Sequence, residues 1–326
     1  MSTNQSTIRW GILATGRIAE NFAKDLLLAD GNELAAVGSR HLDAAAEFAE
    51  RFGGARAHGS YEELVADPDV DVIYVATPHS RHLDDVMLCF EAGKHVLCEK
   101  PLALNADDAA AMITEARSRH LFFAEAMWTR TNPNTRAMLK AVRDGVIGTP
   151  KQVRAELGYA AEEEKTRMWD PALGASALLD MGIYPVTFAY LLLGEPATIS
   201  AAGVLSDQGI DVNAGATLTY PGGAVANIAW NQVAWSDNRG TIAGDEGFIE
   251  MHGRFHESSG YSATVDDVTD TYEQPVIGRG YSHEIIEVAE CLRSGATESA
   301  LLPLDESLAI MKQLDEILHQ LGVAPR

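Results

Sequence analysis

The strongest constraint on the fold is a regular alternation, over residues 1–126, of short apolar runs with amphipathic stretches. The apolar runs are continuous, which is typical of strands buried on both faces of a sheet. They are Arg9–Leu13, Glu33–Gly38, Asp71–Ala76, His95–Cys98 and Leu121–Ala126. The stretches between them have helical periodicity and are Arg17–Leu28, Asp43–Arg51, Tyr61–Ala66, His82–Glu91 and Asp107–Arg119. This order predicts right-handed crossovers and an α/β, doubly wound parallel sheet of the Rossmann type.

The pattern changes after residue 126. A run of strands separated by turns occupies 197–274, which predicts an α+β domain with a largely antiparallel, open sheet. The other expected elements are helices at 133–144, 176–193, 282–293 and 305–321 and a strand at 152–159. We therefore expect two domains, 1–126 and 127–326.

Composition narrows the class of protein. The formal net charge of −22 disfavours nucleic acid and anionic membrane surfaces as partners. No apolar run is expected to reach the roughly 20 residues that span a bilayer. The first residues lack the basic and apolar regions of a secretion signal, and the three cysteines cannot pair completely. We expect a cytoplasmic protein.

The connection after the first strand has the composition of a phosphate-binding turn. The chain there reads Leu13-Ala14-Thr15-Gly16-Arg17-Ile18-Ala19. Free backbone N–H groups and the positive end of the following helix would face a diphosphate. Against the pattern G-x-G-x-x-G/A, alanine replaces the first glycine, while Gly16 and Ala19 keep the other two positions. We predict a dinucleotide site on residues 14–18; a bare strand-to-helix turn is the alternative.

The end of the second strand indicates which dinucleotide is bound. An NAD site usually has an acid here for the ribose 2′-hydroxyl, but this chain has Ser39 and Arg40. A hydroxyl and a guanidinium suit a 2′-phosphate by charge and by bidentate geometry. We predict NADP, with NAD also accepted; a surface arginine at the start of a loop is the alternative.

Polar residues follow the fourth expected strand, at the sheet edge where ligands bind. The sequence is Thr77-Pro78-His79-Ser80-Arg81-His82. Because nothing supplies a third ligand, we expect no metal at His79 and His82. These histidines either cap the next helix or line the nicotinamide side of the cofactor.

Two further motifs are candidates for the reacting centre. Glu99, Lys100 and Pro101 follow the fifth buried strand, where a lysine is poorly explained as a solvated charge, and the Lys100–Pro101 bond is expected to be cis. Asp180 and Tyr184 lie four residues apart on one helix face, within an apolar stretch that also holds Gly182 and Pro185. Such breaks in a local rule accompany function more often than packing. A core tyrosine with a capping aspartate is the alternative.

These motifs resemble the glucose–fructose oxidoreductase and inositol dehydrogenase family over nearly the whole chain. The segments that carry the resemblance are 9–12, 59–64, 96–101, 125–130 and 177–184. Within the family the likeness is greatest to the branches that oxidise trans-dihydrodiols and, with NADP, D-xylose. The resemblance implies a catalytic set of Lys100, Asp180 and Tyr184, and cofactor contacts that include Glu99, Lys100, Trp128 and Arg130. Many family members have histidine in place of Tyr184.

The expected reaction moves a hydride between NADP(H) and a secondary alcohol or carbonyl of a small sugar, polyol or cyclic diol. The substrate proton goes to Lys100 or to Tyr184, and the sequence leaves both open. Two other functions remain: a nicotinamide-dependent glycosidase on the same fold, and a non-catalytic nucleotide-binding regulator.

Assembly is predicted from the run Val225 to Trp235. Trp230 and Trp235 would point to opposite faces of one strand, so neither face is polar. We expect helices over one face and a second subunit over the other, giving a homodimer through the C-terminal sheet.

Overall fold

The computed structural model describes residues 6–162 and 166–325. Contacts within the chain divide it into two compact units. The first contains residues 1–103, 107–131 and 277–307, and the second contains 104–106, 132–276 and 308–326. A single cut after residue 126 does not reproduce this division, because residues 277–307 return to the first unit.

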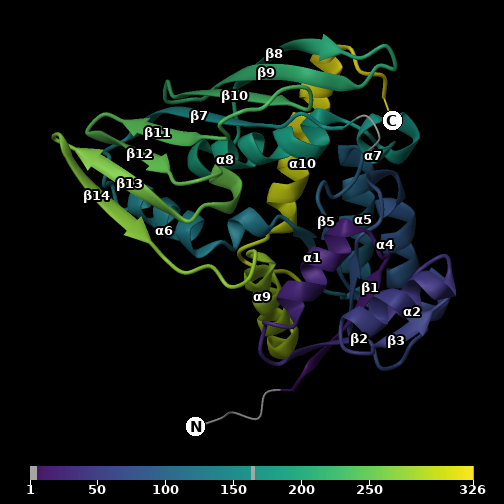
Figure 1. The fold of residues 1–326 in the computed structure, drawn as a ribbon. Coiled ribbons are helices and arrows are strands. Elements are labelled where there is room, and N and C mark those ends of the chain that lie inside the picture. Colours follow the sequence, from purple (N-terminus) through teal and green to yellow (C-terminus); the bar gives the residue numbers. More distant parts are fainter. Residues whose placement is uncertain (1–5, 163–165, 326) are drawn as a thin grey trace, which may run out of the picture. The chain divides into compact units, whose positions relative to one another are not determined.

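The first unit contains a parallel sheet of six strands in the order β3-β2-β1-β4-β5-β6. Figure 1 labels β1, β2, β3 and β5 of this sheet. The strands are β1 Ile8–Leu13, β2 Asn32–Gly38, β3 Arg56–His58, β4 Val72–Val75, β5 His95–Glu99 and β6 Phe123–Ala126. The helices are α1 Arg17–Leu26, α2 Leu42–Arg51, α3 Tyr61–Val65, α4 His82–Glu91 and α5 Ala106–Arg119. The predicted doubly wound sheet is confirmed. The sequence pattern missed β3, which is an edge strand of three residues, none of them fully buried.

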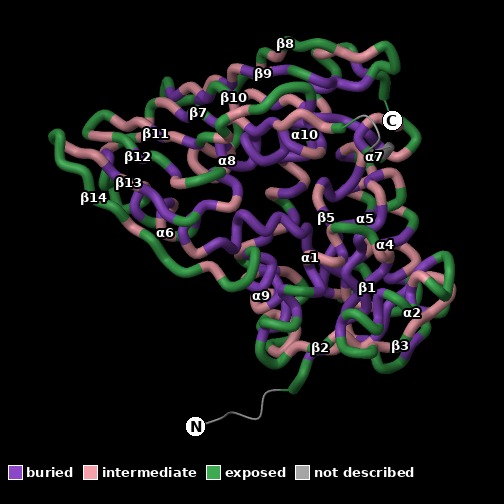
Figure 2. The backbone as a smooth tube through the Cα atoms, viewed as in Figure 1, coloured by how far each residue is buried: buried purple, intermediate pink, exposed green. Residues whose placement is uncertain are grey.

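The core of this sheet is apolar on both faces, as the continuous runs predict. Every residue of β4 is buried, and Tyr74 in that strand stacks on Phe22 of α1 with ring centroids 3.7 Å apart. Trp10 of β1 is fully buried against the same phenylalanine. Figure 2 shows this burial along the central strands.

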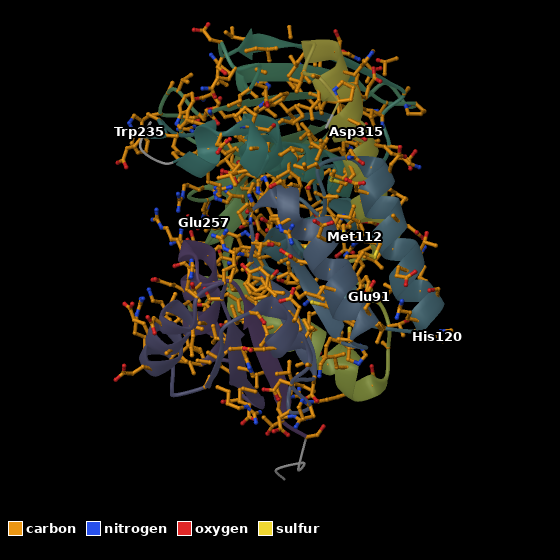
Figure 3. The ribbon with its side chains drawn as sticks, turned by 90° about the vertical axis from the view of Figure 1, so that its right-hand side faces the viewer. Glu91, Met112, His120, Trp235, Glu257 and Asp315 are labelled. Atoms are coloured by element: carbon orange, nitrogen blue, oxygen red, sulfur yellow. The ribbon has the colours of Figure 1, made fainter. Side chains whose placement is uncertain are left out.

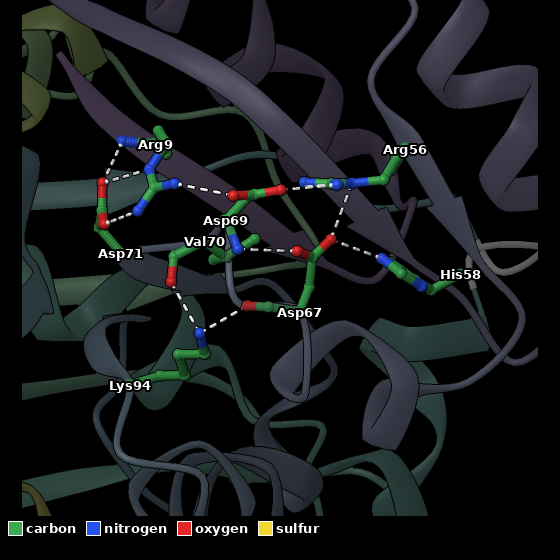
Figure 4. A network of polar contacts seen from close by, with 8 residues as sticks. All are labelled: Arg9, Arg56, His58, Asp67, Asp69, Val70, Asp71 and Lys94. Carbon is green, nitrogen blue, oxygen red and sulfur yellow. Dashed lines mark hydrogen bonds and ion pairs between the residues drawn. The ribbon is translucent and has the colours of Figure 1, made fainter.

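Charged residues pair with one another at the amino ends of the strands (Figure 4). Arg9 binds Asp71 through two guanidinium nitrogens, at 2.7 and 3.1 Å, and reaches Asp69 at 3.1 Å. Arg56 bridges Asp69 and Asp67 at 2.8 and 3.0 Å. This network joins β1 and β3 to the loop that precedes β4.

Helix α9 (Tyr281–Ser294) belongs to the first unit because of a buried aspartate on α1. The Asp25 carboxylate accepts the backbone N–H groups of Arg279, Gly280 and Ser282 at 2.9 to 3.2 Å. It therefore caps the N-terminus of α9, more than 250 residues away in sequence. No local pattern in the sequence predicts such a contact.

The second unit contains a mixed sheet in the order β14-β13-β12-β11-β7-β10-β9-β8. The strands are β7 Pro150–Gly158, β8 Thr198–Leu205, β9 Asp211–Thr219, β10 Val225–Asn231, β11 Gly240–Gly244, β12 Gly247–Met251, β13 Gly260–Val265 and β14 Val268–Glu273. Only β7 and β10 pair in parallel, so the predicted largely antiparallel sheet is confirmed. Its helices are α6 Pro133–Arg143, α7 Thr166–Trp169, α8 Ile183–Leu193 and most of α10 Leu304–Leu321.

One apolar helical segment corrects the expectation about membrane-length runs. The segment Pro171–Leu193 is long and apolar enough, by length and composition, to cross a bilayer. However, 72 % of its most apolar window is buried inside the protein. Seven residues of α8 are buried, and the helix packs against β7 and β10. The segment is therefore a buried core helix of the second unit.

The strand that carries Trp230 is shorter than predicted. β10 ends at Asn231, whose side-chain oxygen accepts the N–H groups of Val233 and Ala234 and so turns the chain. Trp235 lies beyond the strand with 81 % of its surface exposed (Figure 3). The interpretation that both tryptophans lie on one strand is therefore wrong. The outward side chains of β10 are Val225, Asn227, Ala229 and Asn231.

Candidate functional site

The turn after β1 combines a strained alanine with an uncapped helix. Ala14 has φ of +86°, a left-handed conformation that favours glycine. Its N–H donates to the carbonyl of Gly38 at the end of β2, at 2.9 Å. Helix α1 then begins at Arg17, with Gly16 as its N-cap and no side chain capping it. Its first N–H groups therefore point out of the turn and suit an anion.

Gly16 is the residue whose presence the protein itself does not explain. Its φ of −74° and ψ of 176° are open to any amino acid. A Cβ placed on it would meet no heavy atom of the described residues within 4 Å. Neither backbone strain nor packing requires glycine here. Close approach of a phosphate to the backbone would require a glycine at this position. Thr15 and Ile18 lie half-buried on either side of it.

The end of β2 presents the two residues that suit a 2′-phosphate. Ser39 is buried, and its N–H donates to the carbonyl of His58 in β3 at 3.2 Å. Arg40 follows it with an exposed side chain. Within residues 6–162 and 166–325 it has no hydrogen bond or ion pair. A cation held at the sheet edge without a counter-ion is suited to an anionic ligand.

The end of β4 contains a buried hydroxyl and two histidines. The Thr77 hydroxyl is buried and makes no hydrogen bond with any described residue. Pro78 follows it, and His79 is buried at the start of a short 3-10 helix. The Thr77 hydroxyl is thus available for a cofactor at this edge.

His82 links two turns at this edge of the sheet. Its ring nitrogens face the carbonyls of Pro101 and Thr77 at 2.9 and 3.0 Å, and the side chain has no exposed surface. Burial lowers the pKa of this imidazole, and the two carbonyls oppose that shift. His82 therefore acts inside the protein: it fixes the turn after β4 against the turn after β5.

The end of β5 holds Lys100 beside a buried carboxylate. Glu99 accepts a short hydrogen bond from the Tyr74 hydroxyl and another from the Lys100 N–H at 3.1 Å. Burial and the nearby Glu99 carboxylate raise the pKa of Tyr74 well above its usual value, so it stays a donor. The Lys100–Pro101 bond is cis, as predicted. Lys100 is half-buried at the carboxyl edge of the sheet.

A second carboxyl group behind Glu99 was not foreseen from the sequence. Glu284 of α9 is fully buried, and neither of its oxygens has a partner among the described residues. Burial, followed by the charges of Glu99 and Asp25, raises its pKa well above the usual range. Burial therefore disfavours the charged form of a carboxyl group that lies close enough to Glu99 to be affected by its charge, and only the tertiary fold brings the two together.

Trp128 and Arg130 are both buried in the first unit. Trp128 stacks on Tyr281 of α9, with ring centroids 4.6 Å apart and planes 19° from parallel. Arg130 pairs with Glu306 at 2.7 Å through one guanidinium nitrogen. The other nitrogen, Nη2, is buried with no hydrogen bond to the described residues.

In the second unit, Asp180 and Tyr184 lie on one continuous helical segment. Leu178–Gly182 form a π-helix, in which the Ile183 N–H reaches back five residues to Leu178, and α8 follows. Asp180 forms a bidentate pair with Arg167 of α7, at 3.0 and 3.4 Å. π-Helical turns of this kind are common at functional sites.

Tyr184 is buried and its ring contacts His256, with centroids 4.8 Å apart. His256 lies in a short 3-10 helix, Phe255–Glu257, more than 70 residues away in sequence. The sequence pattern missed both Arg167 and His256, because only tertiary contacts bring them to Asp180 and Tyr184. No cluster of three or more metal-ligating side chains occurs in the described parts of the chain.

A parallel sheet with an uncapped glycine turn at its carboxyl edge defines a dinucleotide-binding protein. Comparison with known proteins makes the class specific. Residues 8–126 match an oxidoreductase family with an NAD-binding Rossmann fold, and residues 135–250 match the GFO/IDH/MocA C-terminal domain. The chain belongs to the GFO/IDH/MocA family of NAD(P)-binding oxidoreductases.

Three relatives illustrate the range of this family. The trans-1,2-dihydrobenzene-1,2-diol dehydrogenase of Mus musculus is 35 % identical over 97 % of both chains. The NADP-dependent D-xylose 1-dehydrogenase of Hypocrea jecorina is 36 % identical over 99 % of this chain and 94 % of its own. A solved 3-ketoreductase of Actinomadura kijaniata, in complex with NADP and TDP-benzene, is 27 % identical over 97 % and 98 % of the two chains, with a TM-score of 0.86.

Proposed function

We propose that this protein transfers a hydride between NADP(H) and a secondary alcohol or carbonyl carbon of a small sugar, polyol or cyclic diol. The observation that carries the choice of cofactor is the pair Ser39 and Arg40 at the end of β2. A guanidinium without a counter-ion stands where an NAD-specific site has an acid. The D-xylose and ketoreductase relatives, which are named or solved with NADP, support the same choice.

The carboxyl edge of the first sheet fits this cofactor. The α1 N-terminus and Gly16 would hold the diphosphate, with Ala14, Thr15, Arg17 and Ile18 around it. Thr77, Pro78 and His79 lie at the switch point of the strand order, beside β1, and are proposed to border the nicotinamide side. The other residues proposed to contact the cofactor are Glu99, Lys100, Trp128 and Arg130. When bound, the nicotinamide supplies the hydride chemistry, and the chain supplies binding and proton transfer.

Lys100, Asp180 and Tyr184 are proposed as the catalytic residues. Oxidation of an alcohol needs a group that removes the hydroxyl proton as the hydride departs. A free phenol holds its proton up to about pH 10, and an ammonium group nearby favours the phenolate. The two groups would therefore act as a pair, with Lys100 or Tyr184 as the proton acceptor. Asp180, already held by Arg167, would orient a substrate hydroxyl.

A substrate panel tests this proposal. The full-length protein is assayed for NADPH formation with D-xylose, D-glucose, an inositol and trans-1,2-dihydrobenzene-1,2-diol, and each reaction is repeated with NAD. We expect turnover of at least one of these alcohols, with NADP preferred. Absence of turnover with every alcohol and both cofactors would contradict the proposed activity.

We also propose that the protein is a homodimer through the outward face of the C-terminal sheet. That face carries small and polar side chains, such as Thr217, Asn227 and Thr241, together with exposed Val204 and Phe248. In a two-fold homodimer, the same face of each subunit pairs with its copy. Light scattering at micromolar concentration should give the mass of two chains, and a monomer would overturn this proposal.

We further propose that the protein is cytoplasmic. Cys89 and Cys98 are buried free thiols, which are typical of proteins in a reducing compartment.

A further inference from the structure

A buried aspartate holds the start of the helical segment that carries Asp180 and Tyr184. Asp211 is the first residue of β9 and has no exposed surface. One of its carboxylate oxygens accepts the Ser176 hydroxyl at 2.5 Å. The other accepts the Leu178 N–H at 2.6 Å and the Trp230 indole N–H at 3.1 Å. Two segments more than 50 residues apart, at Ser176–Leu178 and at Trp230, therefore meet at one carboxylate.

These contacts cap the segment in two layers. The Leu178 N–H is the first of the π-helix, and helix starts leave such groups without an internal partner. Asp211 accepts it directly. The Ser176 hydroxyl, which donates to Asp211, accepts the next one, from Leu179 at 3.2 Å. A negatively charged carboxylate at this end of the helix also interacts favourably with the positive end of the helix dipole.

Packing fixes the same segment from the side. A Cβ on Gly182 would lie 2.9 Å from the Trp230 ring and 2.7 Å from the Leu178 side chain. The helix therefore rests directly on the indole whose N–H is bound by Asp211. Asp180 and Tyr184 lie within two residues of this contact.

We propose that Asp211 is a positioning residue, which fixes the start of the π-helix and thereby the placement of Asp180 and Tyr184. The inference rests on the proposed function for its effect on turnover. A displacement of about 1 Å in a reacting group costs on the order of 10²-fold in rate. Asp211 variants should therefore lower kcat strongly, while the KM for NADP changes less than about twofold, because the proposed cofactor residues lie in the other unit.

The test compares three substitutions at this position. Asp211→Asn keeps an oxygen that can accept the Leu178 N–H, Asp211→Leu fills the space without an acceptor, and Asp211→Ala does neither. Positioning by hydrogen bonds predicts that kcat is retained best by asparagine and that leucine is no better than alanine. If Asp211→Leu preserves kcat as well as Asp211→Asn does, filling the buried space is enough for activity. The hydrogen bonds of Asp211 would then not position the helix, and the inference would be wrong.

Amide hydrogen exchange gives a readout that needs no substrate. In Asp211→Ala the amides of 178–183 should exchange at least about tenfold faster, while the strands of the first unit stay protected. Asp245→Ala is the matched control, since Asp245 also accepts a backbone N–H in this unit, from Thr149 at 2.7 Å, but in an exposed turn. The control should leave both kcat and this exchange unchanged.

Two milder variants cover the case in which Asp211 variants fail to fold. Ser176→Ala and Trp230→Phe each remove one donor to the carboxylate, and each should lower kcat about three- to tenfold with NADP binding retained. Full activity in both would overturn the inference. Failure of the proposed function looks different: the wild type would turn over no alcohol, while the exchange pattern would still report on Asp211.

Discussion

At the amino ends of β1, β3 and β4, Arg9 and Arg56 are bound to three aspartates, whereas at the carboxyl end of β2 Arg40 has no partner in the described chain. Both ends belong to one sheet and both are rich in charge. The amino end uses its charges to join strands and loops, as Figure 4 shows. Among the described residues, the carboxyl end leaves a guanidinium and a buried threonine hydroxyl without partners and a helix start without a side-chain cap.

On the proposed function, the difference separates residues that stabilise the fold from residues that bind the cofactor. Paired charges contribute to stability without any ligand, while a polar group that is buried without a partner, such as the Thr77 hydroxyl, costs free energy unless something binds it. Substitutions at the amino end should therefore lower stability and leave kinetics unchanged. Substitutions of the unpaired polar groups at the carboxyl end should leave stability unchanged and alter the kinetics. The five predictions below test this contrast and mark where it ends.

The largest effect is expected at the proposed reacting groups. Tyr184→Phe keeps the ring and should fold normally, yet kcat should fall by about 10²-fold or more. Lys100→Met, at the carboxyl end of β5, should lower it at least as much. The double variant should be scarcely worse than either single one, because the proposed mechanism gives both groups one and the same proton transfer. Near-normal turnover in Tyr184→Phe would contradict this assignment, and the proton acceptor would then be Lys100 or a histidine.

The cofactor preference comes next. Arg40→Ala removes the charge proposed to bind the 2′-phosphate, so the KM for NADP should rise by about tenfold or more while that for NAD barely changes. Thermal unfolding should be unaffected, because Arg40 has no partner to lose within the described residues. Arg51→Ala is a matched control: this exposed arginine pairs with Glu20, at 2.9 Å. Equal effects on both cofactors would remove the basis for NADP.

The amino end should behave in the opposite way. Asp67 is buried and binds Arg56 and His58, each at 3.0 Å. Asp67→Ala should lower the free energy of unfolding by about 1–3 kcal/mol, measured with urea, and leave kcat and KM unchanged. A change in kcat with stability intact would break the contrast between the two ends.

The same aspartate gives this contribution a pH dependence. Burial alone would raise the pKa of Asp67, but the Asp69 N–H and His58 outweigh it, so the pKa is lowered. A lowered folded-state pKa stabilises the protein above the unfolded value of about 4, and that contribution disappears as the pH falls below it. The stability gap between wild type and Asp67→Ala should therefore close in acid, and a gap that is constant with pH would contradict this assignment.

What the sequence predicted follows from how strong each local signal is. Strands buried on both faces, such as β4, leave continuous apolar runs that are easy to find. The edge strand β3 leaves no such signal, because it is only three residues long and none of them is buried. The end of β10 depends on an asparagine turn, so the apolar pattern wrongly extended to Trp235.

The site divides in the same way. The sequence suggests Gly16, Ser39, Arg40 and Lys100 as candidates because each follows a strand that the pattern locates. Arg167, His256 and Asp211 were missed, since each meets its partner across a long stretch of chain. The contact between Asp25 and α9 was unpredictable for the same reason.

The smallest predicted effect concerns Ala14, in the turn that follows β1 at the carboxyl end of the sheet. Ala14 adopts a left-handed backbone that costs an L-residue about 1–2 kcal/mol. Ala14→Gly relieves that strain but adds freedom to the unfolded chain, worth about 0.5–1 kcal/mol. The net gain in stability should be about 1 kcal/mol or less, seen as a small rise in Tm. Because the turn keeps its shape and its bond to Gly38, the KM for NADP should stay the same. A large loss of NADP affinity in Ala14→Gly would mean that the alanine methyl group itself contacts the cofactor.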